Sequence, residues 1–476
     1  MENITINEII LATKGTLAVG NTDDVINSVS IDSRNIQENA LFIPIMGENT
    51  DGHNYIQNAF DNGAKASLIE EKYDANNYNG GAIIKVQSTK KALRDLAKYY
   101  RNKFNISVVG VTGSVGKTTT KEMIASVLGE TLDIIKTEKN YNGQLGLPLT
   151  IFNIEKHHNV AVLEMGVSEI GEMDKLADIA GADIGVITNI GLSHIENFKS
   201  VEVTCREKMK MIQKEGGTFF LNGDSPLLAK AHEYTDKEIV YYGINGDFPY
   251  KCEEIYSNGN NTNFTLVTNQ FREQIQIPCL GLHNVYNALA AIAVAQKFDI
   301  HMDDIKKGLL KFKNVAMRQQ ISKIGDITLI DDSYNASPDS VKSSVSVLKN
   351  LSPNGRNIVV IADMLELGEH SQKIHYETGR YIALEGIDIL ITVGKDSAYL
   401  SNGAISANQK LKLIHFDGNK EAFEYLKNIL SKNDKVLIKG SRGMHTDEIV
   451  NDLKNYYSND LDFQPDSNIE SSLNFN

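Results

Sequence analysis

The strongest chemical signal in the sequence is a glycine-rich turn followed by a lysine and three threonines. The segment reads GVTGSVGKTTT, and an all-apolar run stands before it. Gly110, Gly113 and Gly116 allow a tight backbone turn whose N–H groups converge on phosphate oxygens at the start of the next helix. In turns of this kind the lysine, here Lys117, reaches the β- and γ-phosphates, and the next hydroxyl, here that of Thr118, ligates Mg²⁺.

This turn predicts that the protein binds ATP together with Mg²⁺. The commonest form of the pattern has a glycine where Val111 stands, so the shorter core T-G-x-x-G-K-T is the form that fits. The nucleotide-binding residues expected in the turn are Gly113, Ser114, Val115, Gly116, Lys117, Thr118 and Thr119. The turn alone names no reaction, because transport, signalling, kinase and ligase proteins all use one.

Two further side chains are expected close to the phosphates. Glu164 ends the apolar run NVAVLEM, and His194 follows the run IGVITNI after a short loop. Both should lie beside the phosphate turn, because parallel strands present their carboxyl ends at one edge of the sheet. A carboxylate there reaches Mg²⁺ directly or through water, and an imidazole beside it favours a second metal position that clamps a transferring phosphoryl group. The alternatives are a solvated strand end for Glu164 and a structural histidine for His194.

The composition narrows the class of protein. The 476 residues include 48 Lys and Arg against 61 Asp and Glu, a net charge of −13, which disfavours nucleic acid as the main partner. No apolar run is long enough to span a bilayer, and the N-terminus lacks a basic start followed by an apolar core, so we expect neither a membrane span nor export. Cys205, Cys252 and Cys279 include no CxxC pair, which predicts ordinary thiols in a reducing cytoplasm.

The elements that position these residues fall into three bodies. Short apolar strands alternate with polar loops up to an amphipathic helix that begins after Ser88. At Ile106 the rhythm changes to the buried strands and crossover helices of a parallel sheet, and several β-strands follow between about 217 and 280. From Ile327 onward, five apolar runs are each followed by a helical stretch, which predicts a third α/β body.

The expected fold class is therefore α/β in three domains. We expect a small α/β domain over residues 1–100, a central P-loop domain with a parallel sheet over 101–318, and a Rossmann-like domain over 319–457. Residues 458–476 are polar and acidic without periodicity, so they are expected to be disordered.

Several ordered motifs resemble the Mur ligases of peptidoglycan synthesis. TGSVGKTTTKEM, TEKNYNGQLGLPLT, LNGDSP and GLHNVYNALAAIAVA are similar to the family's central ATPase domain. DDSYNASPDSVKSSVSVL, IADMLELGEHS and KGSRGMHTDEIV resemble the C-terminal domain of the member that adds D-alanyl-D-alanine, and DSRNIQENALFIPIMGENTDGH resembles its N-terminal domain for the UDP substrate. The resemblance covers residues 27 to 456 and implies a C-terminal domain that closes over the site.

The resemblance implies a cytoplasmic ligase that acts in cell-wall synthesis and hence in cell shape and division. Its substrates besides ATP would be UDP-N-acetylmuramoyl-tripeptide and D-alanyl-D-alanine, and we expect a monomer. The γ-phosphoryl group would pass to the terminal carboxylate of the tripeptide, and the amine of the dipeptide would then displace phosphate from the acyl phosphate. Such a step needs neutralised charge around the γ-phosphate and two acceptors held in line.

Roles for individual residues also follow from the resemblance. Catalytic roles are implied for Lys117, Glu164, His194 and Lys208, and metal ligation for Thr118, Glu164, His194 and Lys208, the last as a carbamate formed with CO₂. Further nucleotide contacts are implied for Asn287, Arg318, Asp332, Tyr334 and Asn335. Contacts to the other substrates are implied for Ser33, Arg34, Asp51, Gly52, His53, Thr137, Asn140, Asn142, Lys439, Ser441 and Arg442.

Simpler interpretations stay open beside these roles. Lys210 could carry the carbamate in place of Lys208, and Lys208 could be an exposed helical lysine without a role in the site. Asn287 could be a helix cap, and residues 439–442 could form a solvated basic turn. Residues 51–53 could form a turn that only fixes the first domain. For the whole protein, the alternatives are a ligase for another carboxylate, such as a folylpolyglutamate synthetase, and an ATPase that only switches conformation. The sequence leaves open the diamino acid of the tripeptide, acceptance of D-Ala-D-lactate, carbamylation, the oligomeric state and the role of the tail.

Overall fold

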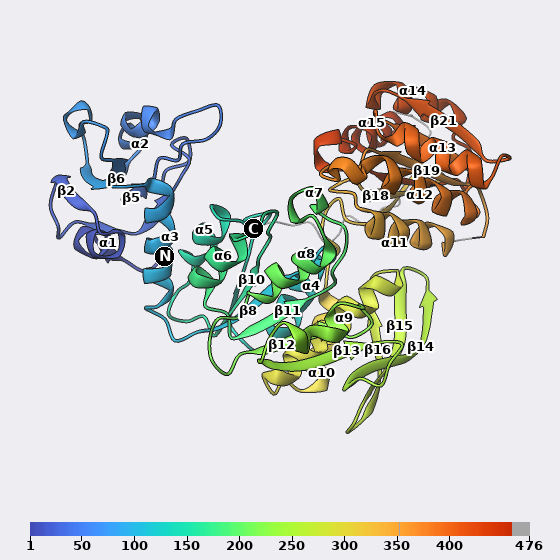
Figure 1. Ribbon diagram of the computed structural model, residues 1–476, viewed down its shortest axis with the longest axis horizontal. Helices are drawn as coiled ribbons and strands as arrows, with labels where there is room; N and C mark the ends of the chain where they lie inside the picture. The colour runs from blue at the N-terminus through green and yellow to red at the C-terminus, as the bar shows by residue number, and fades with distance from the viewer. Residues whose placement is uncertain (352, 459–476) are drawn as a thin grey trace.

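The computed structural model describes residues 1–351 and 353–458, and it forms three bodies that follow one another in space as they do along the chain (Figure 1). The expected borders at 100/101 and 318/319 lie at the end of helix α3 (Thr89–Arg101) and just before strand β17 (Gln320–Ile324). The tail expected to be disordered lies, apart from Ser458, outside the described residues. No helix in the described ranges is long and apolar enough to cross a membrane.

The N-terminal body is a five-stranded sheet with helices packed against it. The strand order is β2-β7-β6-β5-β4, in which β2 is antiparallel to β7 and the other pairs are parallel. The strands are β2 (Thr16–Val19), β4 (Ser28–Ser30), β5 (Ala40–Phe42), β6 (Ala64–Glu70) and β7 (Ala82–Val86). A short ribbon of β1 (Ile4–Thr5) and β3 (Val25–Ile26) completes it, with α1 (Ile6–Thr13), η1 (Gly52–Tyr55), α2 (Ile56–Asp61) and η2 (Ala75–Asn77).

Helix α3 joins this body to the central one. As predicted, Ser88 caps it by accepting a hydrogen bond from the Lys91 N–H, and its apolar face is buried. The Tyr100 hydroxyl donates to the Ile154 carbonyl (2.7 Å), and the Arg101 guanidinium donates to the Ala180 carbonyl (3.1 Å). The helix therefore fixes the N-terminal sheet to the helices of the next body.

The central body is built on a nine-stranded sheet in the order β16-β15-β14-β13-β12-β11-β8-β10-β9. The parallel part comprises β8 (Ser107–Thr112), β9 (Ile134–Lys136), β10 (Val160–Glu164), β11 (Ile184–Ile187), β12 (Thr218–Asn222) and β13 (Glu238–Gly243). Strand β14 (Tyr250–Asn258) pairs parallel with β13, and the antiparallel strands β15 (Asn261–Thr268) and β16 (Arg272–Ile277) extend the sheet. The strands expected between 217 and 280 thus belong to the same sheet as the phosphate turn.

The helices of this body fill both faces of the sheet. They are α4 (Lys117–Leu128), α5 (Gly146–Ile151), α6 (Glu172–Ala180), α7 (Ile195–Phe198), α8 (Val201–Met209), η3 (Leu228–Glu233), α9 (Leu282–Lys297) and α10 (Met302–Lys311). Helix α9 is alanine-rich and buried for most of its length, and it packs against α4. This contact holds the helix that follows the phosphate turn.

One glycine does not act as the sequence led us to expect. Gly110 lies inside strand β8, not in the turn. A Cβ atom there would come within 2.8 Å of the Met211 sulfur and 3.0 Å of the Met165 sulfur, so glycine at this position makes room for packing. The expectation that Gly110 helps the chain to turn is wrong, and the turn depends on Gly113 and Gly116.

The C-terminal body is a six-stranded sheet in the order β17-β18-β22-β19-β20-β21. The five predicted strands are β18 (Ile327–Asp332), β19 (Asn357–Ala362), β20 (Ile389–Val393), β21 (Lys412–Phe416) and β22 (Lys435–Lys439), all parallel, and β17 is an antiparallel addition at the edge. The helices are α11 (Pro338–Lys349), η4 (Gly368–His370), α12 (Ser371–Leu384), α13 (Ser397–Ala407), α14 (Asn419–Ile429), η5 (Arg442–Met444) and α15 (Asp447–Ser458).

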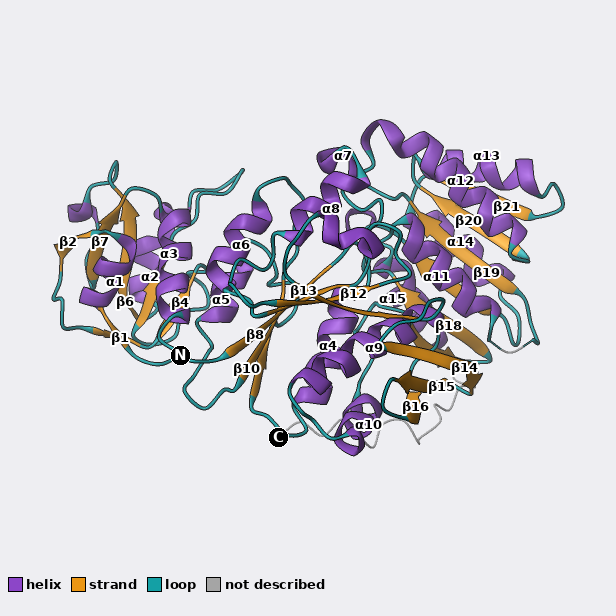
Figure 2. Ribbon diagram, turned by 60° about the horizontal axis from the view of Figure 1, so that its bottom comes forward, coloured by secondary structure: helices purple, strands orange, loops and turns teal. Residues whose placement is uncertain are grey.

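Helices cover both faces of this sheet (Figure 2). In β19, Val359 and Ile361 pack with residues of α11, α12 and α13, whereas Ile358 and Val360 pack with residues of α14 and α15. Successive side chains of a strand point to opposite faces, so an all-apolar strand is the expected sequence for a sheet buried on both sides. The predicted three-domain α/β architecture is confirmed.

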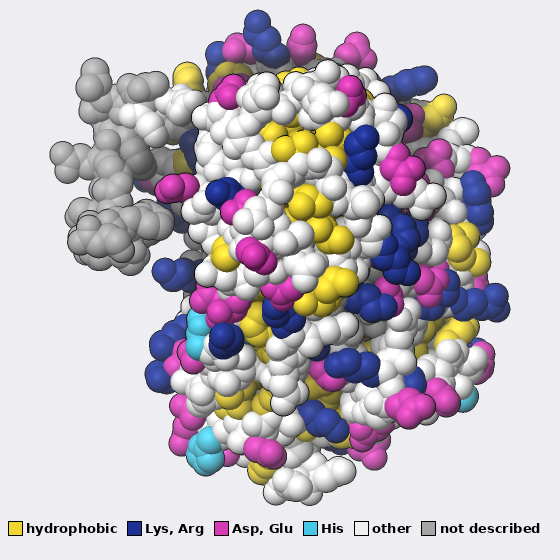
Figure 3. All heavy atoms as spheres, turned by 90° about the vertical axis from the view of Figure 1, so that its left-hand side faces the viewer, with side chains coloured by type: hydrophobic (Ala, Val, Ile, Leu, Met, Phe, Trp, Pro, Cys, Tyr) yellow, Lys and Arg dark blue, Asp and Glu magenta, His cyan; other side chains and the backbone are white. Residues whose placement is uncertain are grey.

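The surface seen from the N-terminal end carries both charges. Figure 3 shows basic and acidic side chains interspersed on this face, with small hydrophobic areas between them. Nucleic acids bind continuous basic surfaces, and this face does not present one.

Candidate active site

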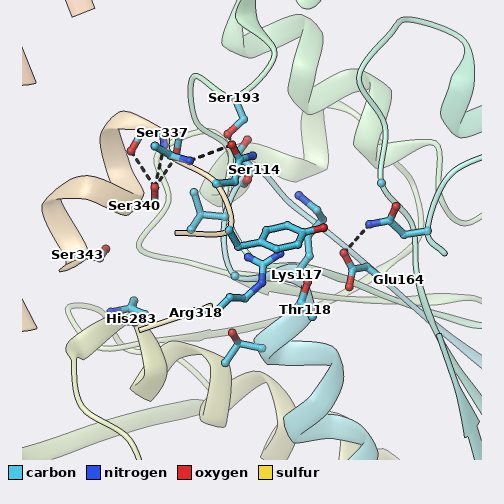
Figure 4. Close-up of a pocket in the computed structure, with 18 of the residues that line it drawn as sticks. Ser114, Lys117, Thr118, Glu164, Ser193, His283, Arg318, Ser337, Ser340 and Ser343 are labelled. Carbon is cyan, nitrogen blue, oxygen red and sulfur yellow. Dashed lines mark hydrogen bonds between the residues drawn. The ribbon is translucent and has the colours of Figure 1, made fainter. Parts of the chain in front are cut away.

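A cavity of about 400 Å³ lies where the central and C-terminal bodies meet (Figure 4). It adjoins the carboxyl end of β8 and the beginning of α4, the position expected for a ligand of a parallel sheet. The sequence-predicted residues that line it are Ser114, Val115, Gly116, Lys117, Thr118, Thr119, Asn142, Glu164, His194, Asn287, Arg318, Asp332, Tyr334, Asn335 and Lys439. Residues distant in sequence from both bodies therefore share one cavity.

The phosphate turn has the geometry that anion binding requires. Gly113 and Gly116 have φ values of 149° and 87°, and α4 begins at Lys117 with no side chain capping it. The first helical bond of α4 runs from the Thr120 N–H to the Gly116 carbonyl, so the N–H groups before Thr120 have no helical acceptor. Together with the positive end of the helix dipole, they form a site for phosphate.

The turn is held in shape by a segment that the sequence analysis missed. The Asn189 side-chain oxygen accepts from the Val115 N–H (2.8 Å), and the Asn189 carbonyl accepts from the Ser114 N–H (3.0 Å). The Thr188 hydroxyl donates to the Val115 carbonyl. The signal was present, since both residues lie in TNIGLSH directly after β11, but their partner is recognisable only in three dimensions.

Lys117 lies above the turn and contacts its backbone. Its ammonium donates to the Gly113 carbonyl (2.9 Å). Burial lowers the pKa of Lys117, the charge of Arg318 lowers it further, and the carboxylate of Glu164 opposes both. A cation held in this way is placed to neutralise an incoming phosphate without first losing a strong ion pair.

Glu164 is a buried carboxylate with one oxygen free for a ligand. It is 2% exposed, and its Oε1 accepts from the Asn142 amide (2.7 Å), a bond drawn in Figure 4. Its Oε2 is buried and has no hydrogen-bond partner among the described residues. Buried carboxylate oxygens are rarely left unpaired, so this one fits a cation. Thr137, which is buried and does not line the cavity, fixes the strand end by accepting from the Glu164 N–H (3.0 Å).

No cluster of three or more His, Cys, Asp or Glu side chains suited to a metal occurs in the described parts of the chain. Magnesium commonly takes only one or two protein carboxylates and completes its shell with phosphate oxygens and water. Glu164 and the buried hydroxyl-bearing Thr118 fit such a shell.

His194 contacts the C-terminal body. It stands at the start of α7 with a φ of 58°, and its Nδ1 is 2.6 Å from the Glu366 carboxylate, whose residue has a φ of 61°. Both residues are in the left-handed region, which is uncommon for side chains other than glycine. The imidazole thus lines the cavity, and its Nδ1 contacts the Glu366 carboxylate across the two bodies.

Lys208 and Lys210, the two candidates for the carbamate, have different surroundings in the structure. Lys208 is 2% exposed, and burial together with the charge of Lys117 lowers its pKa to about 7. Lys210 is partly exposed and makes ion pairs of 2.9 Å with Asp174 and Glu207, which raise its pKa. Lys208 is therefore the lysine with an available neutral amine, although it lies behind the cavity lining.

Asn287 and Arg318 take different positions around the cavity. Asn287 lies within α9, where its oxygen accepts from the Thr120 hydroxyl (2.9 Å) and its amide donates to Asn284 (3.0 Å), so it is not a helix cap. The Arg318 guanidinium stacks on the Tyr334 ring at 4.2 Å from its centre. Arg318 is flanked by Met317 and Gln319, whose φ values of 61° and 48° turn the chain sharply at the junction of the two bodies.

Lys439 is buried and paired, not solvated. Its ammonium donates to the Asp332 carboxylate and to the Asn335 carbonyl (2.9 Å), and the Lys439 side chain is 2% exposed. Burial lowers the pKa of Lys439, whereas Asp332 opposes this. Ser441 is also buried and accepts from the Leu365 N–H (2.9 Å). The interpretation of 439–442 as a solvated basic turn fits only Arg442, whose side chain is 54% exposed.

The predicted substrate residues of the N-terminal body lie away from this cavity. Arg34 is 85% exposed and forms two 2.9 Å bonds to Asp32, while Ser33 is buried. A second cavity, of about 260 Å³, lies between this body and the central one, and Asp32 and Tyr141 line it from opposite sides. Asn140, which directly precedes Tyr141 in the chain, is exposed.

The DGH segment forms a closed internal network. The Asp51 carboxylate accepts from the His53 backbone (3.0 Å), its ring (2.7 Å) and the Tyr73 hydroxyl, while the second ring nitrogen accepts from the Glu70 N–H. Burial would raise the pKa of Asp51, but these bonds lower it to about 2. A Cβ at Gly52 would lie 2.5 Å from the Ile45 nitrogen. These contacts support the simpler interpretation, a turn that fixes the first domain.

Several cavity residues were absent from the sequence analysis. His283 is one, and burial lowers its pKa to about 4, so its ring is neutral. Gln319 donates to Ser344 (3.2 Å), and its backbone donates to Asp332 (3.2 Å). Three serines of α11 and its cap also line the cavity: Ser337, Ser340 and Ser343. Because they are three residues apart, they lie on one face of the helix, and this spacing could have identified them from the sequence.

Comparison with known proteins gives consistent matches over the chain. Residues 25–101 match the Mur ligase family catalytic domain, residues 111–295 the Mur ligase middle domain, and residues 317–442 the Mur ligase glutamate ligase domain. The UDP-N-acetylmuramoyl-tripeptide--D-alanyl-D-alanine ligase of Bacillus subtilis (strain 168) is 39% identical over 455 residues, which cover 94% of this chain and 98% of that protein.

Solved structures agree with this result. A crystal structure of MurF from Acinetobacter baumannii superposes with a TM-score of 0.88 at 30% identity and covers 96% of this chain and 99% of its own. The MurF ligase from Thermotoga maritima in complex with ADP gives a TM-score of 0.80 at 27% identity, with 91% and 98% covered. From the domain matches, the identity and the shared three-body fold, we conclude that the chain belongs to the Mur ligase family.

Proposed function

We propose that the protein is an ATP-dependent ligase that joins D-alanyl-D-alanine to UDP-N-acetylmuramoyl-tripeptide, giving the UDP-pentapeptide, ADP and phosphate. The observation that carries the proposal is the cavity in which the phosphate turn of the central body faces Arg318 and the β18 loop of the C-terminal body. The named activity of the Bacillus subtilis relative, which matches nearly the whole chain, supplies the substrates.

The chemistry follows from the charges around the cavity. A tripeptide carboxylate oxygen attacks the γ-phosphorus, and the bond from that phosphorus to the β–γ bridging oxygen breaks to release ADP. The dipeptide amine then attacks the carbonyl carbon of the acyl phosphate, loses a proton, and phosphate leaves. Lys117, Arg318 and the free N–H groups of α4 neutralise the phosphates and hold them in line.

We assign Mg²⁺ to Thr118 and Glu164, with His194 and Lys208 as a carbamate completing the set. When bound, the metal supplies positive charge beside the phosphates. The free Oε2 of Glu164 supports its role. The pKa of about 7 supports that of Lys208, because only a neutral amine adds to CO₂. His194 lines the cavity, and because its Nδ1 contacts Glu366, Nε2 is the ring nitrogen left to serve as a ligand.

We place the UDP moiety near the N-terminal body and the peptide end in the main cavity. The exposed guanidinium of Arg34 suits a diphosphate, since its planar fork pairs two oxygens at once. We assign Thr137, Asn140 and Asn142 to the peptide part, because their loop runs from Tyr141, which lines the second cavity, to Asn142, which lines the first. On the C-terminal side we assign Lys439, which lines the main cavity, together with Ser441 and Arg442, which follow it in the chain. We further propose that the enzyme is monomeric and cytoplasmic and has no nucleic-acid partner.

Phosphate release tests the proposal. Purified protein with ATP and Mg²⁺ is assayed with the UDP-tripeptide alone, D-Ala-D-Ala alone, and both, and products are identified by mass spectrometry. Release only with both substrates, with a UDP-pentapeptide mass, is expected, and Lys117→Ala should abolish it. Release without an acceptor would identify a conformational ATPase, and no release in any mixture would direct the search to other carboxylates.

A further inference from the structure

A large cavity without an assigned role lies on the other side of α11 from the candidate active site. Its volume is about 740 Å³, it is open to solvent, and it is lined by the segment Leu192–Glu202 of the central body and by α11, η4 and α12 of the C-terminal body. Figures 1 and 2 both place α7 beside the C-terminal body, and α7 contacts η4. Small-molecule sites typically have volumes of 300 to 1,000 Å³ and often occur between domains.

The interior of this cavity is mainly apolar. Side chains from both bodies contribute: Leu192, Ile195 and Val201 from one, and Ile374, Tyr381 and Leu384 from the other. Leu384 is 68% exposed. Transfer of an apolar ligand to such a surface would remove both the ligand and these side chains from water.

The rim of the cavity is rich in unpaired positive charge. Lys199, Lys342, Lys373 and Arg380 line it, and none of them lies within 4.0 Å of a carboxylate of the described residues. Lys342 instead faces the Tyr381 ring, at 5.7 Å from its centre. Two carboxylates, those of Glu202 and Glu377, line the cavity with these four cations, and the charge of Lys342 also acts on Asp339, which is outside the lining. In a chain with a net charge of −13, this concentration of free cations is local.

We infer that this interdomain cavity binds a small amphipathic anion, one with an unbranched or ring-shaped apolar body and a single carboxylate or sulfonate. The apolar part lies among the residues of both bodies, and the anionic end meets the rim cations. Because the ligand contacts α8 and α12 together, it links the central and C-terminal bodies. Binding does not depend on the proposed function, whereas any effect on turnover rests on it.

Decanoate is a suitable probe, measured by isothermal titration calorimetry on the full chain without nucleotide and below the concentration at which decanoate forms micelles. We expect one saturable site per chain. Octanoate, two methylenes shorter, should bind roughly tenfold more weakly. Decyltrimethylammonium has the same apolar chain and the opposite charge, and it should show no saturable binding. Absence of decanoate binding, or equal binding of the cationic probe, would overturn the inference.

Charge reversal at the rim locates the site. The double variant Lys342→Glu/Lys373→Glu should weaken decanoate binding at least tenfold. The double variant Lys410→Glu/Lys420→Glu serves as the matched control, because these two exposed lysines make the same charge change on the same body away from the cavity, and it should bind like wild type. Equal binding by wild type and the double variant would place decanoate elsewhere and refute the assignment. All four lysines are exposed, and circular dichroism checks that the variants fold. Ile374→Ser tests the apolar wall and should also weaken binding.

Hydrogen exchange tests the bridging contact. Decanoate should protect amides in residues 195–202 and 371–384 together, and protection of one segment alone would contradict a ligand that spans both bodies. In the phosphate-release assay, an effect of decanoate that the double variant lacks would connect the site to turnover. A chain that binds decanoate but has no ligase activity would refute the proposed function and leave this site intact.

Discussion

Replacing Asp332 with asparagine should destabilise the C-terminal body, because it removes the carboxylate that pairs with Lys439. The Lys439 side chain is 2% exposed and that of Asp332 10%. In the variant the ammonium would have only neutral acceptors, the Asn335 carbonyl and the amide oxygen of the new asparagine, and no opposite charge. Breaking a buried pair by removing one partner typically costs about 3 to 5 kcal/mol, since the remaining charge stays buried without compensation.

The magnitude can be measured by native-state hydrogen exchange of the amides in β18 and β22, the strands that Asp332 and Lys439 terminate. A loss of about 3 to 5 kcal/mol corresponds to protection factors reduced by roughly 150-fold to several thousandfold. Exchange is preferable to a single unfolding transition, because three bodies need not unfold together.

Two further variants make the result specific. Asp326→Asn removes a carboxylate just before β18 whose side chain is 62% exposed and lies 3.4 Å from Lys432, so it should cost less than about 1 kcal/mol. Asp332→Asn/Lys439→Met removes both buried charges and should recover most of the lost stability. Unchanged protection in Asp332→Asn, or a double variant as unstable as the single one, would refute the buried-pair interpretation.

The remaining predictions concern the turn, the first body and the carbamate. Gly116→Ala should lower ATP affinity at least tenfold in a titration, because the added Cβ meets the Asn287 oxygen at 3.0 Å and the backbone φ is 87°. Gly171→Ala is the control, since Gly171 has a similar φ of 84° but no atom within 4 Å of the added Cβ. Equal effects of the two substitutions would refute the steric argument. Asp51→Asn should cost about 1 to 2 kcal/mol at pH 7. The folded pKa of Asp51, about 2, is below the ordinary 3.8, so its stabilisation is full above about pH 4 and disappears as the pH falls through 2. Thermal unfolding of the wild type and of Asp51→Asn at pH 7 and at pH 2 checks this, and a difference in stability between the two proteins that persists at pH 2 would contradict it. Finally, ¹³C NMR with labelled bicarbonate at pH 7.5 should show a carbamate that Lys208→Ala lacks, and its persistence in that variant would transfer the role elsewhere.

Much of the fold was predictable because its determinants are local. The Ser88 cap and the spacing of Leu93, Leu96 and Tyr100 define α3, and the apolar runs of the C-terminal body define its parallel strands. The edge strand β17 was not predicted, because its sequence QISKI is short and half-polar and gains its strand structure from pairing with β18. Gly110 was misinterpreted for a related reason, since the packing sulfurs of Met165 and Met211 are remote in sequence.

The candidate site likewise has one part that could be predicted from the sequence and one part that could not. The phosphate turn is a contiguous motif, so its residues could be named from sequence alone. The choice between Lys208 and Lys210 required knowledge of burial and ion pairs, and the contact of His194 with Glu366 required the relative position of two bodies. The Asn189 bonds to the turn likewise join residues that are far apart in the sequence, since Val115 and Asn189 are separated by 74 positions.

The most direct test of the central claim is an oxygen-transfer experiment. The UDP-tripeptide is labelled with ¹⁸O in both oxygens of its terminal carboxylate and is incubated with ATP, Mg²⁺, D-Ala-D-Ala and the protein. An acyl-phosphate ligase moves one labelled oxygen into the released phosphate and leaves the other in the new amide, so mass spectrometry should find phosphate with one ¹⁸O. Unlabelled phosphate formed at the same rate as ADP would contradict the account, because ATP would then have been hydrolysed by water.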